Sequence, residues 1–394
     1  MLVWSLPKRV AFRFGFIAAI LFVYPAPLGY IPKTDSLAET FGKPMQWLVQ
    51  WVGELVAGER PVVQPTGSGD TLFGYVQLLV IVMLAAIGAA VWSVVDRRRL
   101  AYPRLAHATW IGLRYVLAMI MIGYGFAKLV DGQFPAPDAI RLDQRIGEMS
   151  PMGMLWTFQG SSQPYTIFAG LAEIVPAVLL LWRRTAVIGA VIAMAVMTNV
   201  VMLNFCYDVP VKVFSSELLV IAAVIAMPQL RRLLLAALGY AVPEVPPRAR
   251  SSVRVERVRV AAKLAAVALI VLSQYQMYDQ MSEYKRPRGE LEGLWSVSAW
   301  SGDGERWCKV GFSPWAVAIR QCNDERGLAR GEVIAAGQVI VVGTDLWHYV
   351  HHGDKLVIDF RRNGKPVHAE LTRDPPPLLV SRGFHWIQEF PFNR

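Results

Sequence analysis

Polar residues that could form a functional site cluster between two long apolar runs in the middle of the chain. The runs, Thr185–Leu203 and Val213–Pro228, have the length and composition of consecutive membrane-spanning helices joined by a short turn. Polar groups at membrane depth are costly unless they face a bundle interior or a water-filled cavity, so they indicate function. The structural alternative is that they cap helix ends or reach the interface. The cluster consists of Asn199, Asn204, Asp208, Lys212 and Glu217.

Two charged residues lie inside other predicted spans. Glu173 is near the middle of the span Tyr165–Trp182, where an ionised carboxylate is strongly disfavoured unless it is paired. Lys128 lies near the end of the span Ala108–Val130, with Tyr124 one helical turn before it on the same face. We therefore expect Glu173 to face Lys128, either as an ion pair or as a protonated carboxyl group that is hydrogen-bonded.

The same reasoning predicts a single site in the outer half of the bundle. We expect Glu173, Lys128, Asn204 and Asp208 to converge on one polar pocket, because each comes from a different helix or turn and Glu173 needs a partner. Arg114 lies on the same helical stripe as Lys128. We expect its side chain to extend to the opposite, cytoplasmic interface.

The composition indicates a membrane domain followed by a soluble one. The chain has 394 residues, of which 54% are hydrophobic and 18% are charged, whereas soluble domains have about 25% charged residues. Apolar blocks dominate up to about residue 279. The net charge of +10 comes from Lys and Arg residues gathered at helix ends, where they set membrane topology. We therefore expect a lipid bilayer as the partner and no nucleic acid.

Seven spans are expected in total, with an amphipathic segment, Ser36–Ala57, at the membrane surface between the first two. Arginine clusters at 97–99, 183–184, 231–232 and 248–259 can all lie on one side, which the positive-inside rule makes cytoplasmic. The N-terminus is then cytoplasmic and the C-terminal region extracytoplasmic. The remaining predicted spans are Val10–Tyr30, Leu72–Val95 and Val260–Tyr278.

The spans and composition divide the chain into five parts. Residues 1–104 form a two-span region with an outer amphipathic loop, and 105–240 form a four-helix membrane domain, whose outer loop is 131–162. Residues 241–258 are a basic cytoplasmic linker without fixed structure, 259–280 are the seventh span, and 281–394 form an extracytoplasmic β domain.

The C-terminal region is expected to form a small antiparallel barrel or sandwich. It contains eight short strand-like runs between Leu294 and Thr372, separated by Asp-Gly, Asn-Gly and Gly-Asp turns. Gly293-Leu294-Trp295 resembles the opening of the calycin barrels. Cys308 and Cys322 flank a predicted hairpin, and an oxidising compartment favours a disulfide between them over two free thiols. The histidines of this region show no standard metal-ligand spacing, so we predict no metal site.

Part of the membrane domain resembles the DoxX-like bacterial membrane proteins. The resemblance covers roughly residues 105–235 and rests on Tyr124-Gly-Phe-Ala-Lys128, on Gly170 and Glu173 followed by Arg-Arg-Thr185, and on a further helix pair. Tyr207-Asp-Val-Pro-Val-Lys212 and the ending Arg382–Arg394 resemble a subgroup of that family with a C-terminal β domain. The resemblance implies a four-helix membrane unit, which in some members is associated with sulfur or quinone redox chemistry.

Two functions follow as expectations. One is a redox-linked protein of the bacterial inner membrane that binds a quinone or similar lipophilic ligand among its third to sixth spans. The other is a non-enzymatic scaffold or transport component whose β domain binds a ligand, or a periplasmic or membrane protein partner, outside the cytoplasm. The sequence contains no phosphate loop, nucleophile elbow or Cys-x-x-Cys motif, and leaves open whether the protein is an enzyme.

Overall fold

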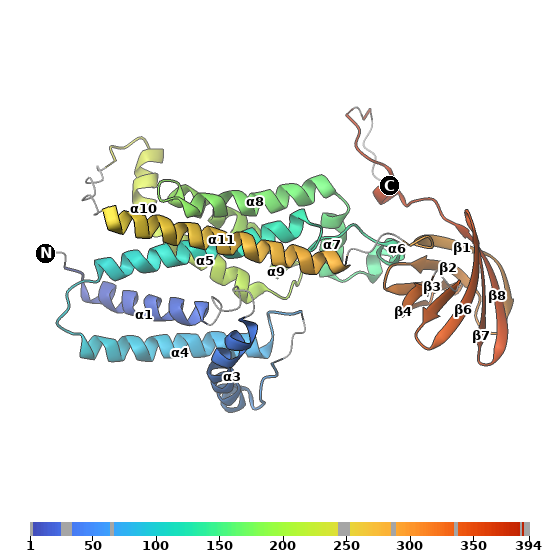
Figure 1. Ribbon diagram of the computed structural model, residues 1–394, viewed down its shortest axis with the longest axis horizontal. Helices are drawn as coiled ribbons and strands as arrows, with labels where there is room; N and C mark the ends of the chain where they lie inside the picture. Colours follow the sequence, from blue (N-terminus) through green and yellow to red (C-terminus); the bar gives the residue numbers. More distant parts are fainter. Residues whose placement is uncertain are drawn as a thin grey trace. The chain divides into compact units, whose positions relative to one another are not determined.

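The computed structural model describes residues 3–24, 34–63, 67–242, 253–284, 289–334, 338–386 and 388–389. The chain divides into two compact units (Figure 1). The first, which we call the helical unit, comprises Met1–Gln133 and Ile167–Asp279. The second, the barrel unit, comprises Phe134–Thr166 and Gln280–Arg394.

The long helices confirm the predicted multi-pass bundle. Among the described residues, five helices or helix segments are long and apolar enough to cross a membrane, namely α4, α5, α8, α9 and Lys212–Leu230 of α10. A shorter apolar segment, Val260–Gln276, lies in α11. The helices are α1 (Leu6–Val23), α3 (Asp35–Ala57), α4 (Leu72–Val95), α5 (Pro103–Leu129), α8 (Gln163–Leu181), α9 (Ala186–Cys206), α10 (Lys212–Ala237) and α11 (Val253–Tyr284). The predicted total of seven spans additionally requires α1 and α11, and stays a prediction.

Small residues allow the helices to pack closely. In α9, the buried positions include Gly189, Ala190 and Ala193. A Cβ atom on Gly189 would lie 2.8 Å from the carbonyl oxygen of Pro176 in α8. Close backbone approach at glycine and alanine is how helices associate in lipid, where burial of apolar surface gives no driving force.

The amphipathic segment forms α3, which packs on α4. Met45, Val49 and Val52 of α3 are buried against Val76 and Val80 of α4. On the other apolar side, the rings of Trp47 and Trp51 are exposed and stacked, with centroids 6.4 Å apart. Exposed tryptophans next to a spanning helix are typical of the membrane interface.

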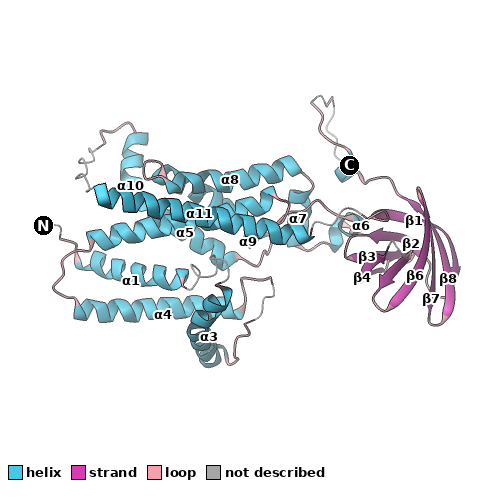
Figure 2. Ribbon diagram, in the orientation of Figure 1, coloured by secondary structure: helices cyan, strands magenta, loops and turns pink. Residues whose placement is uncertain are grey.

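The C-terminal region is a closed eight-stranded barrel in which successive strands pair antiparallel and β8 pairs with β1 (Figure 2). This confirms the barrel rather than the sandwich. Rings fill the interior: Trp307 lies 5.0 Å from Trp300, 5.1 Å from Trp347 and 4.9 Å from Phe360 between centroids. The strands are β1 (Gly293–Gly302), β2 (Trp307–Phe312), β3 (Ala316–Gln321), β4 (Arg326–Ile334), β5 (Val339–Val342), β6 (Asp345–His352), β7 (Lys355–Arg362) and β8 (Lys365–Arg373).

Two connecting segments differ from expectation. The predicted loop 131–162 contains α6 (Ala139–Asp143), the 3-10 helix η1 (Ile146–Glu148) and α7 (Pro151–Gly160), and residues 134–166 group with the barrel rather than with the membrane helices. Asp138 and Ser150 cap α6 and α7. The predicted linker 241–258 is shorter than expected because α11 begins at Val253; residues 243–252 lie outside the described residues.

Candidate functional site

The structure brings Lys128 and Glu173 together, as the sequence predicts. Lys128 Nζ lies 3.0 Å from Glu173 Oε1 and 2.9 Å from Oε2, and it also donates to Gln133 Oε1 at 2.8 Å. The two charged side chains are only 8% and 6% exposed. The Tyr124 ring lies 5.9 Å from Lys128 Nζ, within cation–π range.

Two glycines explain why the pair can form. A Cβ atom on Gly125 of α5 would lie 2.6 Å from the Gly170 carbonyl oxygen, and one on Gly170 of α8 would lie 2.7 Å from the Gly125 carbonyl oxygen. The two helix backbones therefore touch at this crossing. Lys128 and Glu173 each come three residues later in their helices, which places them on the same face as the glycines and opposite each other.

The residues of the α9–α10 turn form a separate group. Asn204 is buried, and its Nδ2 donates to Ser215 Oγ at 3.0 Å. Lys212 Nζ lies 2.8 Å from Asp208 Oδ1. Asp208 has a φ of 50° and a side chain that is 83% exposed, so it does not share the buried surroundings of Glu173. The prediction that Asp208 shares one pocket with the Lys128–Glu173 pair is corrected: Asp208 belongs to an exposed turn.

A residue that sequence reasoning missed, Asp70, fixes this turn. Its Oδ2 accepts from the backbone N–H of Lys212 at 2.9 Å, and its Oδ1 accepts from that of Val213 at 3.1 Å. Asp70 Oδ2 also lies 3.5 Å from Lys212 Nζ. The N-cap residue of α10, Val211, has no side-chain hydrogen bond, so a distant carboxylate serves as the cap. The only sign of this contact in the sequence is that Val211, at the start of α10, has a side chain that cannot cap the helix.

A large cavity of about 1680 Å³ lies in the helical unit and is open at the surface, where lining residues such as Val220 and Met227 are exposed. Its wall is mostly apolar and is formed by α1, α4, α5, α9 and α10. On α10 the lining residues recur every three or four positions, so the cavity follows one face of that helix. These residues are Lys212, Val213, Ser216, Glu217, Val220, Ile221, Val224, Met227, Pro228, Gln229, Arg232, Leu233 and Ala236.

Glu217 is the carboxylate in this wall. Its side chain is half-buried and, among the residues that the structure describes, forms no hydrogen bond or ion pair. The other two predicted site residues contribute less. Asn199 is exposed on α9, and Tyr124 packs against Phe214, with ring centroids 6.3 Å apart.

Arg114 is buried rather than extended to the interface. Its Nε donates to the Leu180 carbonyl oxygen at 2.9 Å, near the C-terminal end of α8. The guanidinium also lies 4.6 Å from the centroid of the Trp110 ring. A carbonyl in the last turn of a helix has no intrahelical donor, so Arg114 supplies one. The expectation that Arg114 extends to the interface is therefore wrong.

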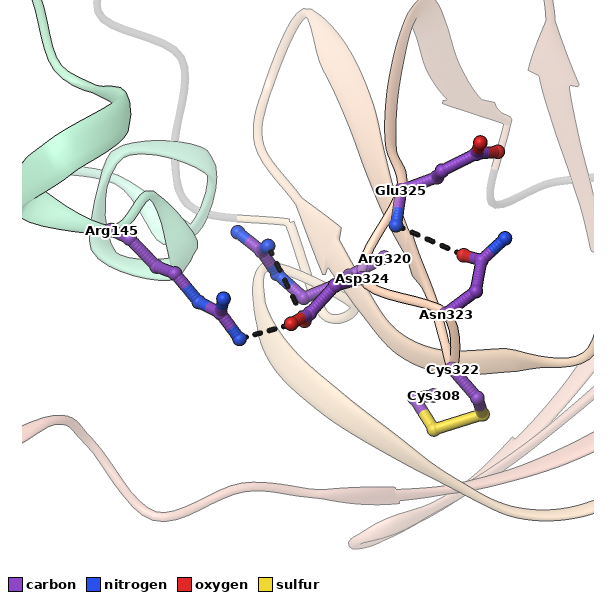
Figure 3. Close-up of a disulfide and its surroundings, with 7 residues drawn as sticks. All are labelled: Arg145, Cys308, Arg320, Cys322, Asn323, Asp324 and Glu325. Carbon is purple, nitrogen blue, oxygen red and sulfur yellow. Dashed lines mark hydrogen bonds and ion pairs between the residues drawn. A yellow bond between two sulfur atoms is a disulfide. The ribbon is translucent and has the colours of Figure 1, made fainter.

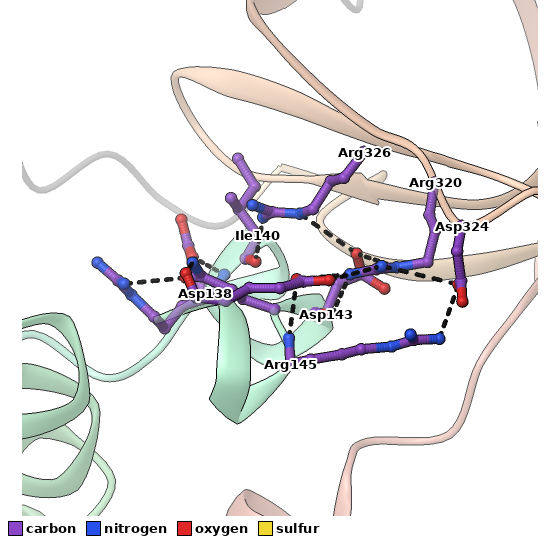
Figure 4. A network of polar contacts seen from close by, with 10 residues as sticks. Asp138, Ile140, Asp143, Arg145, Arg320, Asp324 and Arg326 are labelled. Carbon is purple, nitrogen blue, oxygen red and sulfur yellow. Dashed lines mark hydrogen bonds and ion pairs between the residues drawn. The ribbon is translucent and has the colours of Figure 1, made fainter. Parts of the chain in front are cut away.

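The barrel unit has its own buried ionic cluster (Figure 4). Arg320 of β3 lies 3.2 Å from Asp143 Oδ2 and 3.1 Å from Glu148 Oε2, and donates to the Asp143 carbonyl oxygen at 2.9 Å. The Arg320 hydrogen bond lowers the pKa of Glu148 to about 2, and the contact with Glu148 raises the pKa of Arg320. Arg326 donates to the Ile140 carbonyl oxygen at 2.8 Å. This cluster fixes α6 and η1 to the barrel.

The predicted disulfide is present beside this cluster (Figure 3). Cys308 and Cys322 are bonded, with Cα atoms 4.9 Å apart, and they join β2 to the end of β3. In the next turn, Asp324 Oδ1 accepts from Arg145 at 2.7 Å. Within the described residues there is no group of three or more His, Cys, Asp or Glu side chains that could bind a metal ion.

The apolar helices and the disulfide-bonded barrel define a multi-pass membrane protein with a C-terminal β domain. No protein-family model matches the chain, and no solved structure matches it. A relative, the uncharacterized protein YwoB of Bacillus subtilis (strain 168), is 38% identical over 121 residues, which cover 28% of this chain and 71% of the relative. The chain belongs to the same family as YwoB.

Proposed function

We propose that the helical unit binds a lipophilic ligand, a quinone or a molecule of similar character, in the cavity along α10. The observation that supports the proposal is an apolar cavity of about 1680 Å³ with the Glu217 carboxyl group in its wall. Typical small-molecule pockets have volumes of about 300–1,000 Å³, so this cavity accommodates a long chain as well as a ring. Glu217 offers the ligand a hydrogen-bonding group that no described residue uses.

The resemblance to DoxX-like proteins is consistent with this proposal, since quinone chemistry occurs in that group. Lys128 and Glu173 serve a different purpose in our account. Their charges neutralise each other at a buried helix crossing, and neither residue lines the cavity. We infer that this ion pair stabilises the helix bundle and that Glu217 forms a hydrogen bond with the ligand.

We propose further that the protein lies in the bacterial inner membrane, with a cytoplasmic N-terminus and an extracytoplasmic barrel. The disulfide supports this location, because such bonds persist in oxidising compartments. A cysteine introduced at Lys355 in β7 should react with an impermeant maleimide added to intact spheroplasts. Reaction only after the membrane is permeabilised would contradict the proposed topology.

A second candidate function is that of a scaffold or transport component whose barrel binds a partner. A shallow groove of about 260 Å³ on the barrel supports it. The groove is lined by Pro314, Trp315, Arg330, Gly331, Glu332, Val341 and Gly343, and the Trp315 side chain is 48% exposed. Aromatic and arginine residues are enriched where proteins bind partners.

The test of ligand binding uses purified protein in nanodiscs and decylubiquinone as the probe. Val220 lines the cavity, so Val220→Trp should obstruct its middle and weaken binding at least tenfold by isothermal titration calorimetry. Glu217→Gln should weaken binding several-fold. Val91→Trp is the matched control, because Val91 is an exposed residue of α4 outside the cavity wall. Equal affinity of wild type and Val220→Trp, or equal loss in the control, would exclude the cavity.

A further inference from the structure

The charged residues of the cavity wall are not evenly distributed. His107 lies near the start of α5, Arg183 and Arg184 lie between α8 and α9, and Arg232 lies in the last turns of α10; all four line the cavity. Trp110 Nε1 donates to the Ile225 carbonyl oxygen at 2.9 Å, so the start of α5 lies beside the second half of α10. One end of the cavity is therefore basic.

The other end has a different character. It contains Lys212 and Glu217 from the start of α10 and Tyr75 from the start of α4. At 1.5 Å per residue, Arg232 lies about 30 Å from Lys212 along α10 and about 22 Å from Glu217. The hydrocarbon core of a bilayer is about 30 Å thick. The cavity thus extends along most of a membrane crossing, with arginines at one end only.

Arginines at a membrane interface often do no more than set topology. Three observations distinguish these from ordinary flanking residues. Their side chains line the same cavity as the apolar residues. Arg232 is oriented by Gln229, whose Oε1 accepts from it at 3.2 Å. The aromatic rings of His107 and Trp110, which also line the cavity, stack at this end with centroids 6.3 Å apart.

We propose that the same cavity also binds an anionic amphiphile, with a phosphate head at Arg183, Arg184 and Arg232 and an apolar chain that extends along α10 towards Glu217. Guanidinium groups bind phosphate oxygens in a bidentate manner, and basic pockets between spanning helices on the cytoplasmic side bind anionic lipid headgroups. This inference rests on the proposed function, since it requires that the cavity along α10 accepts lipophilic molecules.

The test compares three probes on the full chain in detergent: phosphatidylglycerol, phosphatidylcholine and inorganic phosphate. Native mass spectrometry should show at least tenfold tighter binding of phosphatidylglycerol than of phosphatidylcholine. The combined variant Arg183→Gln, Arg184→Gln, Arg232→Gln should lose that preference. Inorganic phosphate at millimolar concentration should not displace the lipid, because most of the affinity comes from the chain. Displacement of the lipid by phosphate alone would show that the headgroup accounts for the binding without the apolar chain, which would overturn the inference.

The matched control replaces Arg97, Arg98 and Arg99 by Gln, which removes the same charge after α4 and outside the cavity wall. It should keep the preference for phosphatidylglycerol. If the triple variant of the cavity fails to fold, Arg232→Gln alone should reduce the preference several-fold. A preference that survives in the cavity variants, or that disappears equally in the control, would overturn the inference while leaving the proposed function intact. Loss of decylubiquinone binding in the controls, or its retention in Val220→Trp, would instead contradict the proposed function.

Discussion

Each unit contains a buried cationic side chain, and the two cations differ in the partners that surround them. In the helical unit, Lys128 meets one carboxylate, Glu173, at a crossing where the backbones of α5 and α8 touch. In the barrel unit, Arg320 meets three carboxylates, those of Asp143, Glu148 and Asp324, and a carbonyl oxygen, and the Glu148 side chain is 35% exposed. If Glu173 is removed, Lys128 keeps a neutral partner, Gln133, in buried surroundings. If Arg320 is removed, Asp143 keeps a cation, Arg326, at 3.6 Å, and Glu148 keeps its contact with solvent. Removing one partner of the ion pair should therefore reduce the free energy of unfolding more in the helical unit than in the barrel unit.

The largest effect is expected for Glu173→Gln. Removing one partner of a buried ion pair typically costs about 3–5 kcal/mol, because the remaining charge is left uncompensated. Unfolding of the protein in mixed micelles, followed by circular dichroism, should show a loss of this size. Adding Lys128→Met to the same chain should recover part of it. A Glu173→Gln variant as stable as wild type would contradict the assignment of a buried ion pair. So would a double variant that is less stable than both wild type and Glu173→Gln.

Arg320→Gln should have a smaller effect. Arg320 makes four hydrogen bonds to Asp143 and Glu148, and hydrogen bonds to charged groups each contribute about 1.5–3 kcal/mol. Arg326 remains beside Asp143 and solvent reaches Glu148 when Arg320 is removed, so the net loss should be about that of one such bond. We expect a loss in that range and faster proteolysis within 138–148, because α6 and η1 lose their contact with β3. Arg330→Gln, on the neighbouring strand β4, is the control. If Arg320→Gln lowers the free energy of unfolding more than Glu173→Gln does, the ion pair of the barrel unit contributes more than that of the helical unit, contrary to our expectation.

The smallest effect is a dependence of barrel-unit stability on pH. The folded-state pKa of Glu148 is about 2, below its usual value of 4.5, chiefly because Arg320 donates to it. A carboxyl group with a lowered pKa stabilises the fold above its unfolded pKa, and this contribution is lost as the pH falls through the folded pKa. Stability should therefore decrease between about pH 4.5 and pH 2.

Denaturant titrations at several pH values, with Trp fluorescence as the signal, measure this slope. Glu148→Gln should flatten it, because the variant has no carboxyl group to protonate at this position. An unchanged slope in Glu148→Gln would show that other groups cause the loss.

Local patterns explain how much of the fold could be predicted from the sequence. Span Leu72–Val95 and strand Ala316–Gln321 agree with the structure to the residue, because hydropathy and turn residues act over short distances. The pairing of Lys128 with Glu173 was predictable for another reason, since an intramembrane charge requires a partner.

The contacts that were missed join residues far apart in the chain. Asp70 caps a helix that begins at Lys212, and Arg320 binds Asp143; neither partner carries a local signal of the other. Asp208 was misplaced because it was expected to face the interior of the bundle, although it follows the end of a helix. In the structure α9 ends at Cys206, and Asp208 adopts a left-handed conformation.

Photoaffinity labelling tests the central claim, ligand binding along α10, most directly. The purified protein would be irradiated with a diazirine-bearing quinone, and the labelled residues would be identified by mass spectrometry. We expect labels on Val220, Val224 and neighbouring cavity residues of α1, competed by excess decylubiquinone and absent in Val220→Trp. Labelling confined to residues outside the cavity wall, such as Val91, or labelling that excess quinone does not reduce, would contradict the account.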